Sequence, residues 1–120
     1  MRIVHERDVP LEDFTGGSTY RTLVGDGEGS TPVRFGLQVS PPGYATPDHS
    51  HPYLEIITVL EGTAEGWCED RDGTIALEPG MTLVIPASGR YGFRVTGNGP
   101  FKTYGIHVSP DRIVDRSDDP

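Results

Sequence analysis

The stretch Gly43–Gly62, GYATPDHSHPYLEIITVLEG, decides how the rest of the chain is interpreted. His49 and His51 are separated by one residue, and Glu55 follows four residues after His51. Side chains alternate between the two faces of a strand, so both histidines are expected to point the same way. Two imidazoles and a carboxylate form an N,N,O ligand set for a divalent transition metal. Because glycines frame the set, we favour metal ligands over two solvated histidines beside a chance glutamate.

Length and charge limit the classes of protein to consider. The chain has 120 residues, enough for one domain with one core, and its formal net charge is -8. An acidic surface repels phosphate backbones and anionic lipids, so we expect no nucleic-acid partner and no membrane partner. The sequence has no apolar run of spanning length and a single cysteine, Cys68. These features favour a cytoplasmic protein.

Glycine and proline punctuate the chain densely and exclude long helices. There are 16 glycines and 11 prolines, while an average helix needs about 11 to 12 residues. We therefore predict an all-β fold made of short strands. The expected strands are 1–9, 18–24, 33–40, 54–60, 63–69, 74–77, 81–85, 91–96 and 101–108.

Two segments carry the clearest strand patterns. Val33–Ser40 alternates apolar with polar or small residues, which indicates a half-buried strand. Leu54–Leu60 is apolar on both faces, because Ile57 and Val59 share the face of Glu55 and other apolar side chains occupy the opposite face. Both faces of this strand should therefore be covered, by a second sheet or by another subunit.

The domain organisation is expected to be simple. Residues 1–110 should form one β-barrel domain, because turns recur every eight to twelve residues and a small barrel closes its edges. Residues 111–120 form an acidic C-terminal tail, expected to be a partly ordered surface arm.

The framed ligand segment resembles the first motif of the cupin superfamily, G-x5-H-x-H-x3,4-E-x6-G. Gly43, His49, His51, Glu55 and Gly62 match every fixed position of that motif. A second motif opens with G-x5-P, which Gly80 and Pro86 match. The resemblance implies a cupin-like jelly-roll β-barrel, a homodimer, and one divalent transition metal such as Fe, Mn, Zn or Ni.

The chain departs from the second motif at its histidine ligand. Tyr91 stands where that histidine is expected. A neutral phenol is a poor ligand for Zn²⁺, although a phenolate binds ferric iron. His107 is the other candidate, because the last strand of the family fold runs antiparallel to the strand with the motif glutamate. We expect an open position at Tyr91 with His107 lining the pocket, and keep direct ligation by either residue as alternatives.

Three further residues are candidates for binding a substrate. Arg90, at the bend before Tyr91, is suited to attract an acidic substrate. Tyr44 and Phe93 are aromatic residues that could form pocket walls. For each of them the simpler alternative is an ordinary structural role in packing or in a solvated loop.

Three functions remain open from the sequence. The first is a small metalloenzyme acting on a small organic acid or carbonyl compound, with dioxygenase, isomerase or cyclase chemistry as the resemblance implies. The second is a non-catalytic barrel that binds or senses a metal or metabolite. The third is a structural barrel with a degenerate site, which the retained ligands His49, His51 and Glu55 argue against.

Overall fold

The computed structural model describes residues 1–26, 28–112 and 115–116, and it confirms the all-β class. The described chain contains one short 3-10 helix, and within that part no helix is long and apolar enough to cross a membrane. The regular elements are η1 (Glu6–Asp8), β1 (Glu12–Asp13), β2 (Thr19–Val24), β3 (Arg34–Ser40), β4 (His49–Ser50), β5 (Glu55–Glu61), β6 (Ala64–Cys68), β7 (Ile75–Leu77), β8 (Thr82–Ile85), β9 (Tyr91–Val95), β10 (Phe101–His107) and β11 (Asp115–Arg116).

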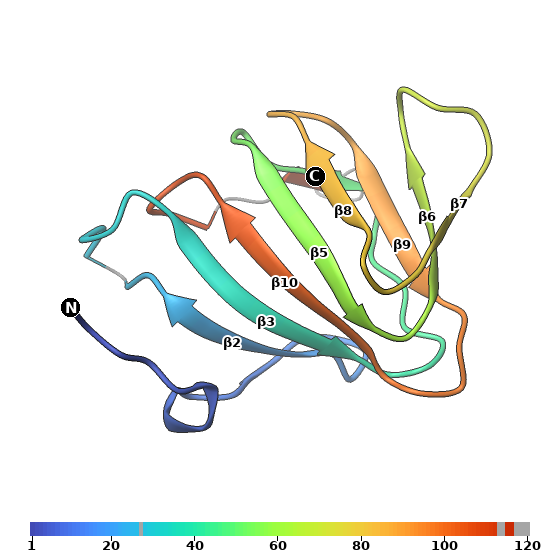
Figure 1. Ribbon diagram of the computed structural model, residues 1–120. Helices are drawn as coiled ribbons and strands as arrows, with labels where there is room; N and C mark the ends of the chain where they lie inside the picture. Colours follow the sequence, from blue (N-terminus) through green and yellow to red (C-terminus); the bar gives the residue numbers. More distant parts are fainter. Residues whose placement is uncertain (27, 113–114, 117–120) are drawn as a thin grey trace.

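Two antiparallel sheets face each other in the jelly-roll arrangement (Figure 1). One has the strand order β1-β2-β3-β10-β5-β8, and the other has the order β11-β4-β9-β6-β7. Neighbouring strands are often distant in sequence, since β10 lies between β3 and β5. Residues near the C-terminus are thereby brought beside the ligand segment.

The core lies between the two sheets, towards the end where β5 turns into β6. Its buried cluster comprises Val59, Ala64, Leu77, Phe93, Val95 and Phe101. The face of β5 that Glu55, Ile57 and Val59 were expected to share is buried in part. Glu55 and Val59 are buried, and Ile57 is half-buried.

The alternating strand β3 turns its apolar side chains away from the other sheet. Backbone register pairs Gly36 with Gly105 and Gln38 with Thr103, so these residues share the inner face with His107. The amide of Gln38 donates to Ser18, a buried serine, which satisfies its polar group inside the fold. The apolar residues of β3 consequently lie on the outer face of the larger sheet.

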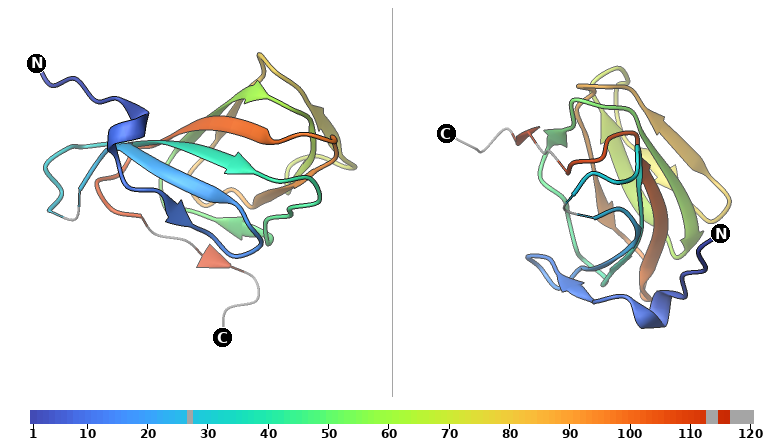
Figure 2. Two further views of the ribbon diagram at one scale, coloured as in Figure 1. Left: turned by 90° about the horizontal axis from the view of Figure 1, so that it is seen from below. Right: turned by 90° about the vertical axis from the view of Figure 1, so that its left-hand side faces the viewer.

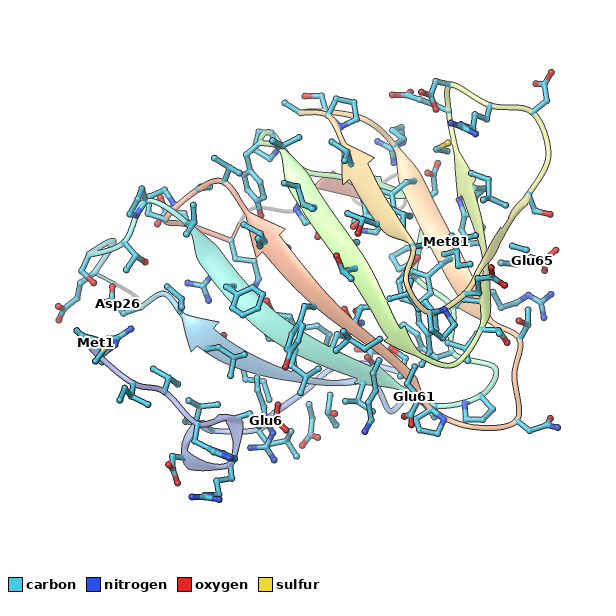
Figure 3. The ribbon with its side chains drawn as sticks, viewed as in Figure 1. Met1, Glu6, Asp26, Glu61, Glu65 and Met81 are labelled. Carbon is cyan, nitrogen blue, oxygen red and sulfur yellow. The ribbon has the colours of Figure 1, made fainter. Side chains whose placement is uncertain are left out.

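The predicted strand at residues 1–9 is wrong. The segment instead contains η1, capped by the side chain of His5, which accepts from the backbone of Arg7. The guanidinium of Arg21 donates to the carbonyls of Glu6 and Val9. These carbonyls therefore bind a side chain, whereas in a strand they would bind the backbone of a neighbouring strand. Met1 lies at the free end of this arm (Figure 3) and is exposed.

The expected acidic tail lies partly outside the described residues, which omit 113–114 and 117–120. Within the tail, β11 pairs antiparallel with β4, where Asp115 lies opposite Ser50 and Arg116 opposite His49. Figure 2 shows this short strand at the edge of the smaller sheet, on the side away from the N-terminal arm. The tail therefore adds a strand to the edge that carries His49.

Candidate metal centre

Four strand ends meet at one end of the fold and position the candidate ligands. β5 begins at Glu55 and β10 ends at His107, and the register places these two residues directly opposite each other. β4 begins at His49, which pairs with Tyr91 at the start of β9. The antiparallel approach of the last strand to Glu55, expected from the family resemblance, is confirmed by this register.

His51, Glu55 and His107 form a compact donor group. One ligand atom from each residue lies within 4.8 Å of the others, and all three residues are buried. The Nε2 atom of His107 lies 2.7 Å from Oε2 of Glu55, and Nε2 of His51 lies 3.4 Å from Oε1. Both imidazoles thus turn the same ring nitrogen towards one carboxylate.

The spacing and chemistry of this group suit a transition-metal ion. Two ligand atoms that are each about 2.1 Å from one ion lie about 3.0 Å apart at a right angle and about 3.4 Å apart at a tetrahedral angle. The two observed nitrogen–oxygen separations, 2.7 and 3.4 Å, lie close to these values. Two imidazoles and a carboxylate, buried together, are the donors that zinc, iron and similar ions select.

His49 lies beside this group but outside it. Its ring centroid is 5.3 Å from that of His51 and 4.4 Å from that of Tyr91. Its Nδ1 is 2.8 Å from the carbonyl of Pro47, and a carbonyl only accepts, so Nδ1 carries the proton. In the neutral ring Nε2 then bears the lone pair, the arrangement common among metal-binding histidines.

Tyr91 contacts the carboxylate through its hydroxyl, which donates to Oε1 of Glu55. Burial and the negative charge of Glu55 raise the pKa of Tyr91 well above its ordinary value. Burial also opposes ionisation of Glu55, but hydrogen bonding and charge from His107, helped by His51 and Tyr91, outweigh it and lower the pKa of Glu55. The site therefore pairs an ionised carboxylate with a neutral phenol.

A cavity of about 390 Å³ lies between the sheets, and Tyr91 forms part of its wall. Apolar side chains line most of it, and the exposed residues Glu69, Asp70 and Arg71 border it at the β6–β7 turn. Its apolar lining includes Ile57, Val59, Ile75, Leu77, Leu83, Ile85, Phe93 and Phe101. Tyr91 links the two regions, because it lines the cavity and its hydroxyl donates to Glu55 of the donor group.

The three proposed substrate-binding residues have different surroundings. Phe93 lines the cavity, and Tyr44 packs against Phe93 with ring centroids 6.0 Å apart. Arg90 lies at the border of the cavity and forms an ion pair with Asp48 at 3.4 Å. The guanidinium of Arg90 is therefore already partnered, although it remains partly exposed.

Tyr53 is a site residue that the sequence interpretation missed. Its hydroxyl lies 3.1 Å from Nδ1 of His51 and 2.9 Å from Nδ1 of His107, and the side chain is buried. Spacing offered one signal, because residues 49, 51, 53 and 55 continue the same period of two. The contact with His107 depends on a pairing between distant strands, which spacing alone does not reveal.

The fold agrees with the comparisons to known proteins. A cupin domain family model matches residues 36–107, which include the whole donor group, whereas no curated protein matches the chain. Among solved structures, the polyketide cyclase RemF from Streptomyces resistomycificus has a TM-score of 0.83 at 24% identity, covering 100% of this chain and 87% of RemF.

Two further structures give the same fold. KdgF from Halomonas sp. has a TM-score of 0.76 at 18% identity, covering 93% of this chain and 96% of that one. A predicted oxalate decarboxylase from Thermotoga maritima has a TM-score of 0.79 at 16% identity, covering 90% of this chain and 99% of that one. At these identities the structures establish a common fold, and the family match extends over more than half of the chain. The protein therefore belongs to the cupin domain family.

Proposed function

We propose that this protein is a metalloenzyme that acts on a small organic acid or carbonyl compound at one divalent metal ion. The observation that carries the proposal is the buried convergence of His51, Glu55 and His107, whose donor atoms lie within 4.8 Å of one another. His49 is the proposed fourth ligand, since its Nδ1 proton is directed at the carbonyl of Pro47. A metal held here would act as a Lewis acid on a carbonyl or carboxylate oxygen, or activate dioxygen if it is iron.

The protein's own side chains supply the remaining functions. The apolar cavity would hold the body of the substrate away from water, and Phe93 would form one of its walls. Tyr91 stays protonated, so its hydroxyl is available as a neutral hydrogen-bond donor between the cavity and Glu55. A flat or branched apolar substrate with one polar end fits this arrangement better than a highly charged one.

The named chemistry of the structural relatives is consistent with this proposal. RemF is described as a polyketide cyclase, and the Thermotoga maritima protein as a predicted oxalate decarboxylase. Both descriptions concern carbonyl or carboxyl compounds, which are the groups that a buried Lewis acid activates. The cavity in the present chain is largely apolar, which favours a ketone-like substrate over a dicarboxylate.

Metal content is the first test. Protein purified without added metal and then incubated with Zn²⁺, Mn²⁺ or Fe²⁺ is expected to retain about one ion per chain by elemental analysis. Glu55→Gln and His107→Ala should lose it, because each removes a donor from the group. His5→Ala is the matched control, as His5 is exposed on the N-terminal arm. Full occupancy in both site variants would contradict the ligand assignment.

Proton exchange at carbon tests the catalytic part of the proposal. The ketone 2-tetralone has apolar rings and acidic protons next to its carbonyl, and these exchange in D₂O at a rate that NMR measures. The metal-loaded protein should accelerate this exchange, and His107→Ala should abolish the acceleration. A loaded protein that binds the ketone without any acceleration would instead support the non-catalytic binding barrel.

A further inference from the structure

One buried tyrosine contacts two of the three residues in the donor group. Tyr53 lies 3.1 Å from Nδ1 of His51 and 2.9 Å from Nδ1 of His107 through a single hydroxyl oxygen. Its ring also stacks on that of His51, with centroids 5.1 Å apart and an interplanar angle of 22°. Both imidazoles are therefore held at the ring edge that faces away from Glu55.

This contact fixes the direction of the opposite nitrogen atoms. With Nδ1 of each ring on the Tyr53 hydroxyl, Nε2 of each ring faces the carboxylate of Glu55, at 3.4 Å from His51 and 2.7 Å from His107. A ring flip in either histidine would exchange a nitrogen for a carbon at both contacts. The Nδ1 atom of His49 is hydrogen-bonded to the carbonyl of Pro47. His49, His51 and His107 therefore each have a hydrogen-bond partner at Nδ1.

We propose that Tyr53 is a positioning residue for the metal centre, one hydroxyl orienting the imidazoles of both His51 and His107. The inference rests on the proposed metal site and adds a residue that lies outside the donor group. Metal-binding histidines generally donate their second ring N–H to a neighbour, and loss of that neighbour costs about 10- to 100-fold in metal affinity. Here one side chain serves two ligands.

The inference predicts which ring nitrogens of His51 and His107 carry protons when a metal is bound. A short contact between Nε2 of His107 and Oε2 of Glu55 needs a proton between them, so without metal Nε2 of His107 carries a proton. Metal binding requires a lone pair on Nε2 of both rings, so both Nδ1 atoms become donors and the Tyr53 oxygen accepts from both.

Metal affinity of Tyr53→Phe is the first test. The phenyl ring preserves the shape but removes the shared acceptor, so Zn²⁺ affinity measured by competition with a chelator is expected to fall about 10- to 100-fold. Tyr104→Phe is the matched control, because it removes a hydroxyl from the strand of His107 but on the opposite face of the sheet. Its Zn²⁺ affinity should equal that of the wild type, and circular dichroism should show both variants folded.

Nitrogen-15 NMR of the wild-type histidines provides a second test that needs no variant at Tyr53. Zn²⁺ should remove the proton from Nε2 of His107, and both His51 and His107 should report protonated Nδ1 atoms in the zinc-bound protein. Wild-type protein that binds none of Zn²⁺, Mn²⁺ and Fe²⁺ would overturn the proposed function together with this inference. Zn²⁺ binding that is equally tight in Tyr53→Phe, or a zinc-bound His107 without a proton on Nδ1, would overturn the role of Tyr53 alone.

Discussion

Tyr91 stands at the position where the family motif has a histidine, and its environment determines what it can do. The hydroxyl donates to Oε1 of Glu55, and the side chain is buried. Burial and the carboxylate both favour the neutral phenol, so the pKa of Tyr91 lies well above 10.0. The neighbouring His107 already supplies a nitrogen to Glu55. Of the two residues that could replace the motif histidine, His107 is the better placed as a ligand, because it belongs to the donor group.

The raised pKa of Tyr91 predicts how stability changes at alkaline pH. Above pH 10.0 the unfolded chain releases the Tyr91 proton while the folded protein keeps it, so the folded state binds more protons and loses stability as the pH rises. The stabilisation is complete below pH 10.0 and is lost as the pH rises through the folded-state pKa. Tyr91→Phe should make the fall in unfolding free energy shallower by about 1.4 kcal/mol per pH unit.

Urea unfolding of the metal-free protein between pH 9 and pH 11 measures this slope. Tyr104→Phe removes a half-buried hydroxyl of the same kind and serves as the control. Identical slopes in wild type and Tyr91→Phe would show that Tyr91 ionises as readily in the folded state as in the unfolded one.

At the residue scale, local spacing predicted that His49, His51 and Glu55 lie close together, since they fall within seven consecutive residues. Of these three, His51 and Glu55 belong to the donor group with His107, and His49 lies beside it. The role of Tyr53 was missed because its second partner, His107, is 54 residues away in the chain. Which nitrogen each ring directs at the carboxylate is set by these hydrogen bonds and could not be derived from spacing.

At the scale of elements, the turn between β5 and β6 depends on a glycine of the motif. Gly62 has a φ of 84°, and a Cβ atom there would lie 2.3 Å from the carbonyl oxygen of Pro100. Gly73, in the turn between β6 and β7, has a similar φ of 76° with nothing within 4 Å of such an atom. The two glycines therefore share a backbone conformation but differ in the space around them.

Alanine substitutions at these two glycines should separate backbone strain from a steric clash. Gly73→Ala is expected to cost about 1 kcal/mol, from the left-handed conformation alone. Gly62→Ala is expected to cost about 3 kcal/mol, because the backbone of Pro100 must also move. Urea denaturation of both variants in metal-free form gives the comparison. Equal losses would mean that the approach of Pro100 to Gly62 does not contribute.

Element order could be predicted from the sequence more reliably than element pairing. Glycine and proline marked the turns, so most strands from Thr19 onwards begin and end close to their expected residues. The strand predicted at residues 1–9 was wrong, because the carbonyls of Glu6 and Val9 bind the side chain of Arg21 instead of a neighbouring strand. The antiparallel approach of β10 to β5 came from the family resemblance, whereas the pairing of β10 with β3 was not predicted, since long-range pairing leaves no local pattern.

At the scale of the whole molecule, the outer face of the larger sheet predicts a homodimer. Val84 on β8 is 66% exposed and Leu60 on β5 is 40% exposed, and half-buried apolar residues continue the face across the neighbouring strands. The continuing residues are Phe35, Ile56, Tyr104 and Ile106. An apolar face of this extent is expected to be covered by a second copy of the chain.

Sedimentation at micromolar concentration should therefore show a dimer. Val84→Glu places a charge on this face and is expected to give monomers that remain folded, because the side chain is already exposed. Ala76→Glu makes the same change at an exposed strand position of the other sheet, on β7, and should remain dimeric. A wild-type protein that sediments only as a monomer would contradict the prediction.

The metal centre is the central claim, and anomalous X-ray scattering tests it most directly. Crystals of the full chain grown with Co²⁺ and measured at the cobalt absorption edge reveal the position of each bound ion. We predict one strong anomalous peak per chain, within about 2.0 to 2.3 Å of the Nε2 atoms of His51 and His107 and of the Glu55 carboxylate. A crystal that contains cobalt but shows no peak between these three side chains would contradict the account.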